Sequence, residues 1–200
     1  MVKSMDKNKH VLAIREILRQ LGEDPTREGL VDTPSRYLSA LQSWTSGYGK
    51  KPGEVLKTFV DGSEDCDDQM VFQGSIPFFS NCEHHLASFF GFVHLAYIPR
   101  GRVVGLSKLT RLVEIYSRRL TIQERITQQV ANALMKHLKV KGAGVVLQAR
   151  HLCMESRGVN KVGIITVTSA LRGCMKNEPA CRAEFMSFVT AVSSGGLKSL

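Results

Sequence analysis

No aspartate occurs after residue 68 in this sequence of 200 residues. Residues 1–68 carry 12 Asp and Glu against 10 Lys and Arg, whereas residues 69–200 carry 6 against 17, and the net charge is +9. A positive field of this kind attracts polyanions, either nucleic acid or a nucleotide triphosphate. Charge alone does not choose between these two classes of partner.

Few aromatic residues are interleaved with the basic ones, and the chain has one Trp and four Tyr, which modestly disfavours a stacking platform for single-stranded nucleic acid. No apolar run approaches the length of a membrane span, so no membrane partner is expected. Neither Gly-x-x-x-x-Gly-Lys nor Gly-x-Gly-x-x-Gly occurs. A bound triphosphate would therefore be held by side chains and a helix start rather than by a glycine-rich loop.

The five cysteines are odd in number and follow no disulfide spacing. The sequence does not start with an apolar signal peptide, so a reducing cytoplasm is the expected compartment. Two of the cysteines lie close to histidines, which suggests metal binding.

A candidate metal site combines two stretches of the chain. Cys82 and His85 lie three residues apart, and zinc binds such a sulfur and nitrogen pair. The second stretch, residues 149–153, follows a run of branched residues that predicts a strand, in which His151 and Cys153 project from one face. Cys82, His85 and Cys153 would leave an open position for water, with His84 and His151 in reserve; His151 as a fourth ligand would instead make a structural site.

These stretches resemble the motifs of the GTP cyclohydrolase I family. The matching segments are residues 82–85, residues 105–111, Gln123-Glu124-Arg125, and His151-Leu152-Cys153 followed by Arg157-Gly158. The resemblance covers about residues 10 to 190. It implies a hydrolase that converts GTP and water to 7,8-dihydroneopterin triphosphate and formate, with Zn²⁺ on Cys82, His85 and Cys153.

The resemblance also implies an α+β tunnelling fold, which is a four-stranded antiparallel sheet in ββααββ order with helices on one face. A helical segment, residues 1–68, would precede a catalytic domain, residues 69–200, and the acidic loop 61–68 is the clearest boundary. Two five-membered rings would stack into a homodecamer with active sites shared between subunits.

Individual roles follow from the same resemblance. His84 and His151 would be catalytic, with His151 protonating a purine nitrogen, and Glu124 would bind guanine, assisted by Gln123. Contacts with the triphosphate would come from Ser107, Lys108, Arg111, Arg157 and Arg36, although Ser39 stands where some members have a lysine.

Taken without the resemblance, several of these residues have simpler interpretations. Thr121 and Glu124 fit a capping box at a helix start. Lys108 and Arg111 are equally compatible with solvated surface charges, and for Arg36 an ordinary exposed position is the better interpretation. The alternative function is a nucleic-acid-binding protein with a structural zinc; a third is a deazaguanine nitrile reductase of the same fold, against which the zinc set counts.

Hydrophobic periodicity predicts the order of the elements. Strand 86–98 is apolar on both faces and should be covered on both, and His94 within it is expected to be a core residue. Helices are expected at 8–22, 33–46, 54–58, 107–119 with Ser107 as its cap, 122–138 and 179–192, and strands at 70–79, 86–98, 143–155 and 162–171.

Overall fold

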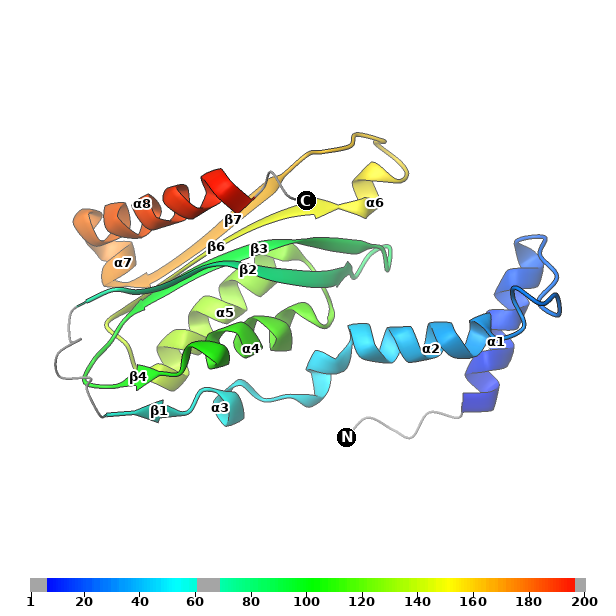
Figure 1. The fold of residues 1–200 in the computed structure, drawn as a ribbon, viewed down its shortest axis with the longest axis horizontal. Coiled ribbons are helices and arrows are strands. Elements are labelled where there is room, and N and C mark those ends of the chain that lie inside the picture. Colours follow the sequence, from blue (N-terminus) through cyan, green and yellow to red (C-terminus); the bar gives the residue numbers. More distant parts are fainter. Residues whose placement is uncertain (1–6, 61–68, 197–200) are drawn as a thin grey trace.

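The computed structural model describes residues 7–60 and 69–196 (Figure 1). The acidic loop 61–68, the predicted domain boundary within it, and Cys66 lie outside the described residues.

The main sheet is built from four antiparallel strands, as expected. The neighbours are, in order, β2 (Val71–Cys82), β3 (Ser88–Ile98), β6 (Gly142–His151) and β7 (Thr166–Gly173). A two-residue strand, β5 (Leu120–Thr121), adds in parallel to the end of β2. Another short pair, β1 (Thr58–Phe59) and β4 (Val103–Val104), forms a separate ribbon. Strands of two residues carry no periodic signal, and the sequence did not predict them.

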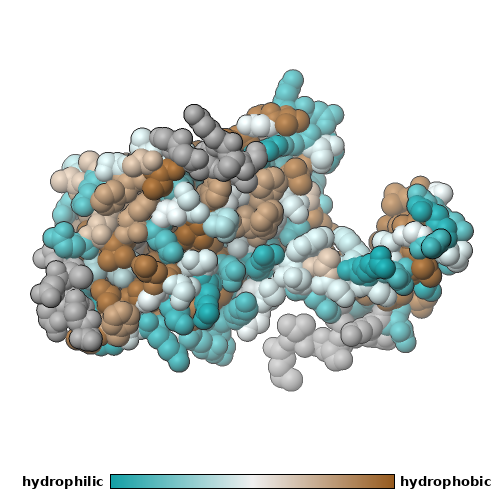
Figure 2. All heavy atoms as spheres, viewed as in Figure 1, coloured by the Kyte–Doolittle hydropathy of each residue, from teal (hydrophilic) through white to brown (hydrophobic). Residues whose placement is uncertain are grey.

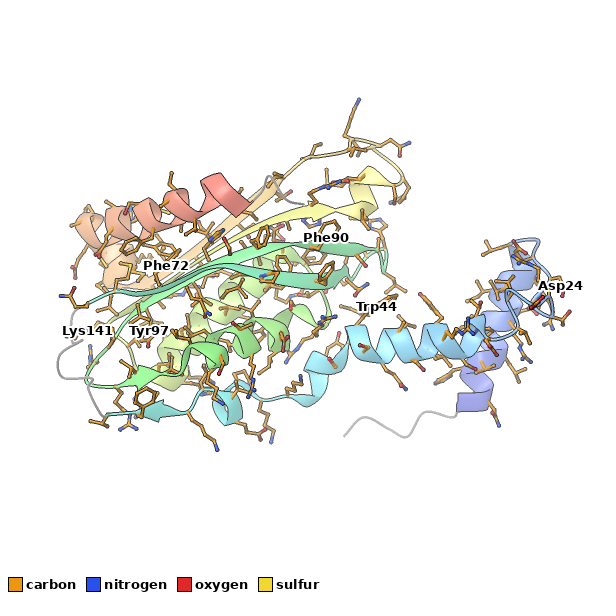
Figure 3. The ribbon with its side chains drawn as sticks, viewed as in Figure 1. Asp24, Trp44, Phe72, Phe90, Tyr97 and Lys141 are labelled. Carbon is orange, nitrogen blue, oxygen red and sulfur yellow. The ribbon has the colours of Figure 1, made fainter. Side chains whose placement is uncertain are left out.

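One face of the sheet packs on α4 (Leu106–Ser117) and α5 (Gln123–Leu138) (Figure 1). Both helices present an apolar stripe to the strands, and residues such as Leu109, Leu112 and Ile126 are fully buried. Tyr97 lies in this layer (Figure 3), where its hydroxyl accepts a hydrogen bond from the amide of Val104 at 3.2 Å. This layer is the principal core of the protein.

The opposite face is covered by α8 (Pro179–Gly196) and the short α7 (Cys174–Asn177) (Figure 1). Phe185 of α8 is fully buried against Ala96 and Val146, and Phe72 packs on its ring at 6.2 Å (Figure 3). The two helices between the strand pairs, α4 and α5, therefore share one face as expected, and α8, whose position was not predicted, covers the other. Cover on both faces explains why strand 86–98 is apolar throughout.

An N-terminal arm extends from the body of the molecule (Figure 1). It contains α1 (Lys7–Gln20) and α2 (Thr33–Trp44), followed by the 3₁₀ turn η1 (Ser46–Gly49) and α3 (Pro52–Val55). Asp32 is the N-cap residue of α2, and its side chain makes no capping hydrogen bond. Apolar side chains stay exposed on α1 and just after it, namely Leu12 and Ile17 within the helix and Leu21 beyond its end. Figure 2 shows hydrophobic residues on the surface of this arm. In the part of the chain that is described, no helix has the length and apolarity needed to cross a membrane.

Candidate metal centre and active site

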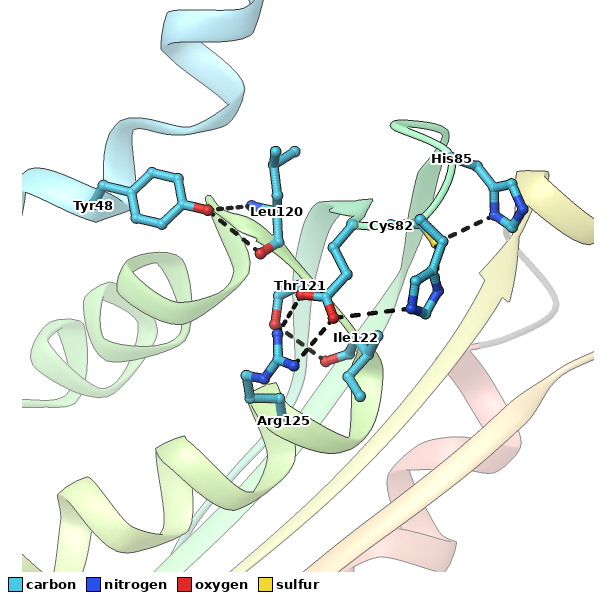
Figure 4. A network of polar contacts seen from close by, with 9 residues as sticks. Tyr48, Cys82, His85, Leu120, Thr121, Ile122 and Arg125 are labelled. Atoms are coloured by element: carbon cyan, nitrogen blue, oxygen red, sulfur yellow. Dashed lines mark hydrogen bonds and ion pairs between the residues drawn. The ribbon is translucent and has the colours of Figure 1, made fainter.

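Cys82 and His85 lie at the turn that joins β2 to β3. The amide of Cys82 donates to the carbonyl of Ala87 and that of Leu86 donates to Cys82, both at 2.8 Å. Leu86 adopts a left-handed conformation with φ of 55°, which reverses the chain within this short connection. The turn places Cys82 Sγ 3.6 Å from Nδ1 of His85 (Figure 4).

Cys153 reaches the same place by a route that the sequence did not predict. Strand β6 ends at His151, and Cys153 lies in a separate single-turn helix, α6 (Leu152–Glu155). The prediction that His151 and Cys153 project from one face of a strand is therefore wrong. An ion pair fixes the helix to the strand, because Arg150 donates two hydrogen bonds to Glu155 at 2.9 and 2.6 Å.

The ligand atoms of Cys82, His85 and Cys153 all lie within 4.8 Å of one another, the one such group among the described residues. Tetrahedral zinc with ordinary bond lengths puts a sulfur and a nitrogen ligand about 3.6 Å apart, which matches the distance between Cys82 and His85. Two thiols and one imidazole suit zinc. The three side chains therefore fit this ion, and His151 does not belong to the group.

Burial and the neighbouring thiol of Cys82 raise the pKa of the Cys153 thiol. The cause is physical: two thiolates side by side in a half-buried site would repel each other. A divalent cation reverses this effect, because it holds both sulfurs in the thiolate form. The pair is thus unfavourable as free thiolates and favourable as metal ligands.

His84 lies beside the cluster on its exposed side. Its Nδ1 is 3.8 Å from Cys82 Sγ, and its Nε2 is 3.9 Å from a carboxylate oxygen of Glu83. Glu83 is in turn bound by both terminal nitrogens of Arg125 (Figure 4). Those hydrogen bonds lower the pKa of the Glu83 carboxyl, so Glu83 stays ionised next to His84.

His151 is held from two sides. Its ring stacks on that of Phe89 at 4.7 Å, nearly parallel, because Phe89 and His151 are paired in the β3–β6 ladder. Its Nε2 lies 2.7 Å from the amide oxygen of Gln123. Burial lowers the pKa of His151, while the negative charges of Glu124 and Glu155 oppose that shift.

The two interpretations of Glu124 are separated at the start of α5. Ile122 is the N-cap residue, and no side chain caps the helix. The Thr121 hydroxyl donates to the carbonyl of Ile122 at 3.4 Å. The capping box is therefore absent, and Glu124 is exposed one residue after Gln123, at the same end of the sheet as His151.

Comparison with known proteins decides the family. A family model described as GTP cyclohydrolase I matches residues 11–190. The chain belongs to the GTP cyclohydrolase I family. A protein named GTP cyclohydrolase 1 from Nitrosospira multiformis is 51% identical over 186 residues, which cover 92% of this chain and 97% of that protein.

Two more relatives carry the same name. The Campylobacter curvus protein is 50% identical and covers 90% of this chain and 93% of its own length. The Mycolicibacterium vanbaalenii protein is 50% identical and covers 88% and 87%. A solved structure of an archaeosine synthase QueF-Like in the apo form overlaps 52% of this chain and 93% of its own, at 19% identity and a TM-score of 0.42.

The residues expected near a triphosphate fall into two groups in this member of the GTP cyclohydrolase I family. Ser107, Lys108 and Arg111 lie in the first turns of α4, which begins after Gly105 rather than at Ser107. The other end of α4 leads to β5, which pairs with Cys82. Since Lys108 precedes Ser117 by nine residues, it lies about 14 Å along the helix axis from the end near Cys82.

The second group consists of Arg157, which lies closer to the candidate metal ligands, and Arg36, which lies outside the body of the molecule. Arg157 follows α6 and is near enough to Cys153 for its charge to lower that pKa. Arg36 lies on the N-terminal arm, where it pairs with Asp32 at 2.9 Å and remains largely exposed. The structure thus brings Arg157 near Cys153, a candidate metal ligand of its own chain.

Two features of this site carried no sequence signal that would have identified them. The Arg150–Glu155 pair, which positions Cys153, joins residues too close in sequence to suggest a tertiary role. The contacts of Gln123 with Leu147, Thr166 and Thr168 are long-range, and only the folded sheet brings them together.

Proposed function

We propose that this protein is a zinc-dependent enzyme that converts GTP and water to 7,8-dihydroneopterin triphosphate and formate. The observation that carries the proposal is the group formed by Cys82, His85 and Cys153 in a chain that matches the GTP cyclohydrolase I family over residues 11–190. Three protein ligands are typical of a catalytic zinc, whereas a structural zinc has four.

Zinc at these three residues would supply a Lewis acid that lowers the pKa of water near C8 of guanine. The surrounding side chains provide the proton transfers. His151 acts as general acid toward a purine nitrogen, and stacking on Phe89 keeps its ring in one plane. His84, exposed beside the cluster, serves proton transfer near the ribose oxygen when the sugar opens.

Guanine recognition is assigned to Glu124. A carboxylate accepts both the N1 and N2 hydrogens of guanine, and adenine offers no such pair of donors. The missing capping box supports this role, because the carboxylate is not used by its own helix. Its position next to Gln123 places it near His151.

The triphosphate is assigned to Ser107, Lys108, Arg111, Arg157 and Arg36. Their separation in one chain supports a site assembled from more than one subunit, because the start of α4 lies away from the Cys82 end of the sheet. We further propose the tunnelling fold, a decamer of two five-membered rings, and the division into residues 1–68 and 69–200.

Incubation with GTP tests the function directly. Zinc-loaded protein should release formate and give a fluorescent pterin after oxidation, in equal amounts. ATP is the matched control substrate and should yield neither product. Zinc-loaded protein that binds GTP without releasing formate would contradict the proposal and support a binding protein with a structural metal.

A further inference from the structure

The amide of Gln123 has a fixed orientation in the structure. Its side chain is buried, with 1% of the residue exposed. Its nitrogen, Nε2, lies 3.1 Å from the carbonyl oxygen of Leu147, 3.0 Å from that of Thr166 and 3.2 Å from the hydroxyl of Thr168. Carbonyl oxygens only accept hydrogen bonds, so the nitrogen has to face them and the oxygen has to face His151.

This orientation determines the proton on His151. The oxygen of Gln123 also only accepts, and it lies 2.7 Å from Nε2 of His151. The hydrogen between them therefore belongs to His151, which makes Nε2 the protonated nitrogen. Nδ1 carries the lone pair in the neutral ring and donates a proton only when the ring is doubly protonated.

A ring of hydroxyl groups holds the amide in place. Thr127 donates its hydroxyl hydrogen to the backbone carbonyl of Gln123 at 2.9 Å. Since that hydrogen is used, the Thr168 hydroxyl donates to Thr127 at 2.7 Å, and Thr168 accepts from the Gln123 amide. The donor and the acceptor of each hydrogen bond are therefore fixed. If the Gln123 amide were flipped, its nitrogen would face the N–H of His151 and its oxygen would face two carbonyl oxygens.

We infer that Gln123 is a positioning residue that holds His151 in one orientation and one tautomer, with Nδ1 directed to the reaction. The inference rests on the proposed function. In the proposed step, a proton moves from Nδ1 of doubly protonated His151 to a purine nitrogen. The ring is left neutral with its remaining hydrogen on Nε2, which is the form that Gln123 stabilises.

The same contacts argue against direct binding of guanine by Gln123. The amide oxygen is used by His151, and the two amide hydrogens already serve three acceptors. A contact with the substrate would require breaking this network in a buried place, which is costly. Exposed Glu124, its neighbour on α5, has no such constraint.

The decisive test is a double-mutant cycle with zinc-loaded full-length protein and GTP. Gln123→Met keeps the length of the side chain and removes the acceptor. We expect kcat to fall about 100-fold, within the usual range for general acid catalysis, with zinc content and the KM for GTP unchanged. Because Gln123 acts through His151, the double variant His151→Ala/Gln123→Met should be no slower than His151→Ala in single turnover.

The controls separate the other roles. Glu124→Gln should raise KM, as expected for a residue that touches guanine, and so provides the contrasting pattern at the adjacent position. If Gln123→Met does not fold, Thr168→Val decides, with a several-fold loss of kcat expected in that variant and recovery in Thr168→Ser.

A raised KM in Gln123→Met, an added loss in the double variant, or an unchanged kcat in Thr168→Val would each overturn the inference. Failure of the wild-type protein to release formate would instead refute the proposed function.

Discussion

Cys82, His85 and Cys153 differ from His84 and His151 in what holds them. The first three face one another across less than 4.8 Å, whereas the Nε2 atom of His151 is already bonded to Gln123. The candidate ligands Cys82, His85 and Cys153 therefore differ in their surroundings from His151, for which we proposed a role in proton transfer. The two groups should respond differently to substitution.

Replacement of Cys153 by serine tests the ligand set. Cys153→Ser should lose most of its bound zinc and its activity while keeping its fold, because a neutral hydroxyl is a poor zinc ligand. His151→Ala should keep one zinc per chain and lose about 10²- to 10⁴-fold in kcat. Metal content by mass spectrometry and circular dichroism check both. A full equivalent of zinc in Cys153→Ser would remove that residue from the site, and zinc loss in His151→Ala would make His151 a ligand.

His94 provides a residue-scale prediction on stability. Burial lowers the pKa of His94, and its Nδ1 accepts a hydrogen bond from the amide of Ser75 at 3.2 Å. Above its ordinary pKa of about 6.5 the ring is neutral in both folded and unfolded chains. Below that pH the unfolded chain binds a proton at His94, whereas the folded chain, in which the pKa is lower, does not. The free energy of unfolding therefore falls as the pH decreases.

The size of this effect is bounded by one proton, about 1.4 kcal/mol per pH unit. His94→Gln keeps an acceptor and removes the titration, so its free energy of unfolding should depend less on pH between 6.5 and 5. Urea unfolding of both proteins at one protein concentration measures the difference. His137→Gln, at a partly exposed position in the last turn of α5, is the control. Parallel pH curves for wild type and His94→Gln would contradict the prediction.

At the scale of elements, the position of Cys153 depends on α6 rather than on β6. This helix has four residues, too few to be stable alone. Arg150 and Glu155 bind it to the preceding strand, and Arg150 also lies over the ring of Phe90 at 5.8 Å. The ion pair therefore holds the helix that carries one candidate metal ligand, Cys153.

Glu155→Gln should weaken zinc binding by removing the charge from this pair. Residues that orient metal ligands typically contribute 10- to 100-fold to affinity, and we expect about tenfold here. Competition with a fluorescent zinc chelator measures the change. Glu184→Gln makes the same substitution at an exposed position on α8 and should have no effect. Equal zinc affinity in both variants would show that α6 is held by other contacts.

Elements defined by local sequence patterns could be predicted from the sequence, whereas features that depend on contacts between distant residues could not. The long helices and the four main strands have strong periodic patterns, and all were found within a few residues. The break between β6 and α6 was missed, because His151-Leu152-Cys153 alternates like a strand and the Arg150–Glu155 pair that accompanies the turn gives no periodic signal. The double cover of residues 86–98 was inferred from composition, but no local pattern identified α8 as the second layer. The cluster of candidate metal ligands was predicted. The hydrogen bonds that hold the Gln123 side chain were not, because they join residues more than 40 positions apart in the sequence.

At the scale of the whole molecule, the sheet leaves hydrogen-bonding edges uncovered. Among the residues that the structure describes, strand β7 has a neighbour on one side only, and β5 pairs with β2 only at Asn81 and Cys82. Open edges favour pairing with another chain. The apolar side chains exposed on α1 add a second surface of the same kind. Both features support the proposed assembly into rings.

Separation of the two halves of the site gives the last prediction. Arg111 lies near the start of α4, whereas His151 lies at the opposite end of the sheet, beside the zinc ligands. In a ring, the start of α4 in one subunit would serve the zinc site of its neighbour, so each active site would need two chains. His151→Ala and Arg111→Ala should each be nearly inactive alone and recover part of the activity when co-assembled, because some boundaries then contain two intact halves.

Mixed rings made from differently tagged chains, isolated by both tags and assayed for formate, test this prediction. The control is a mixture of His151→Ala with His84→Ala, which places both defects in the same half and should recover nothing. Purified mixed rings without recovered activity would contradict shared sites, and an active monomer at high dilution would contradict the assembly itself.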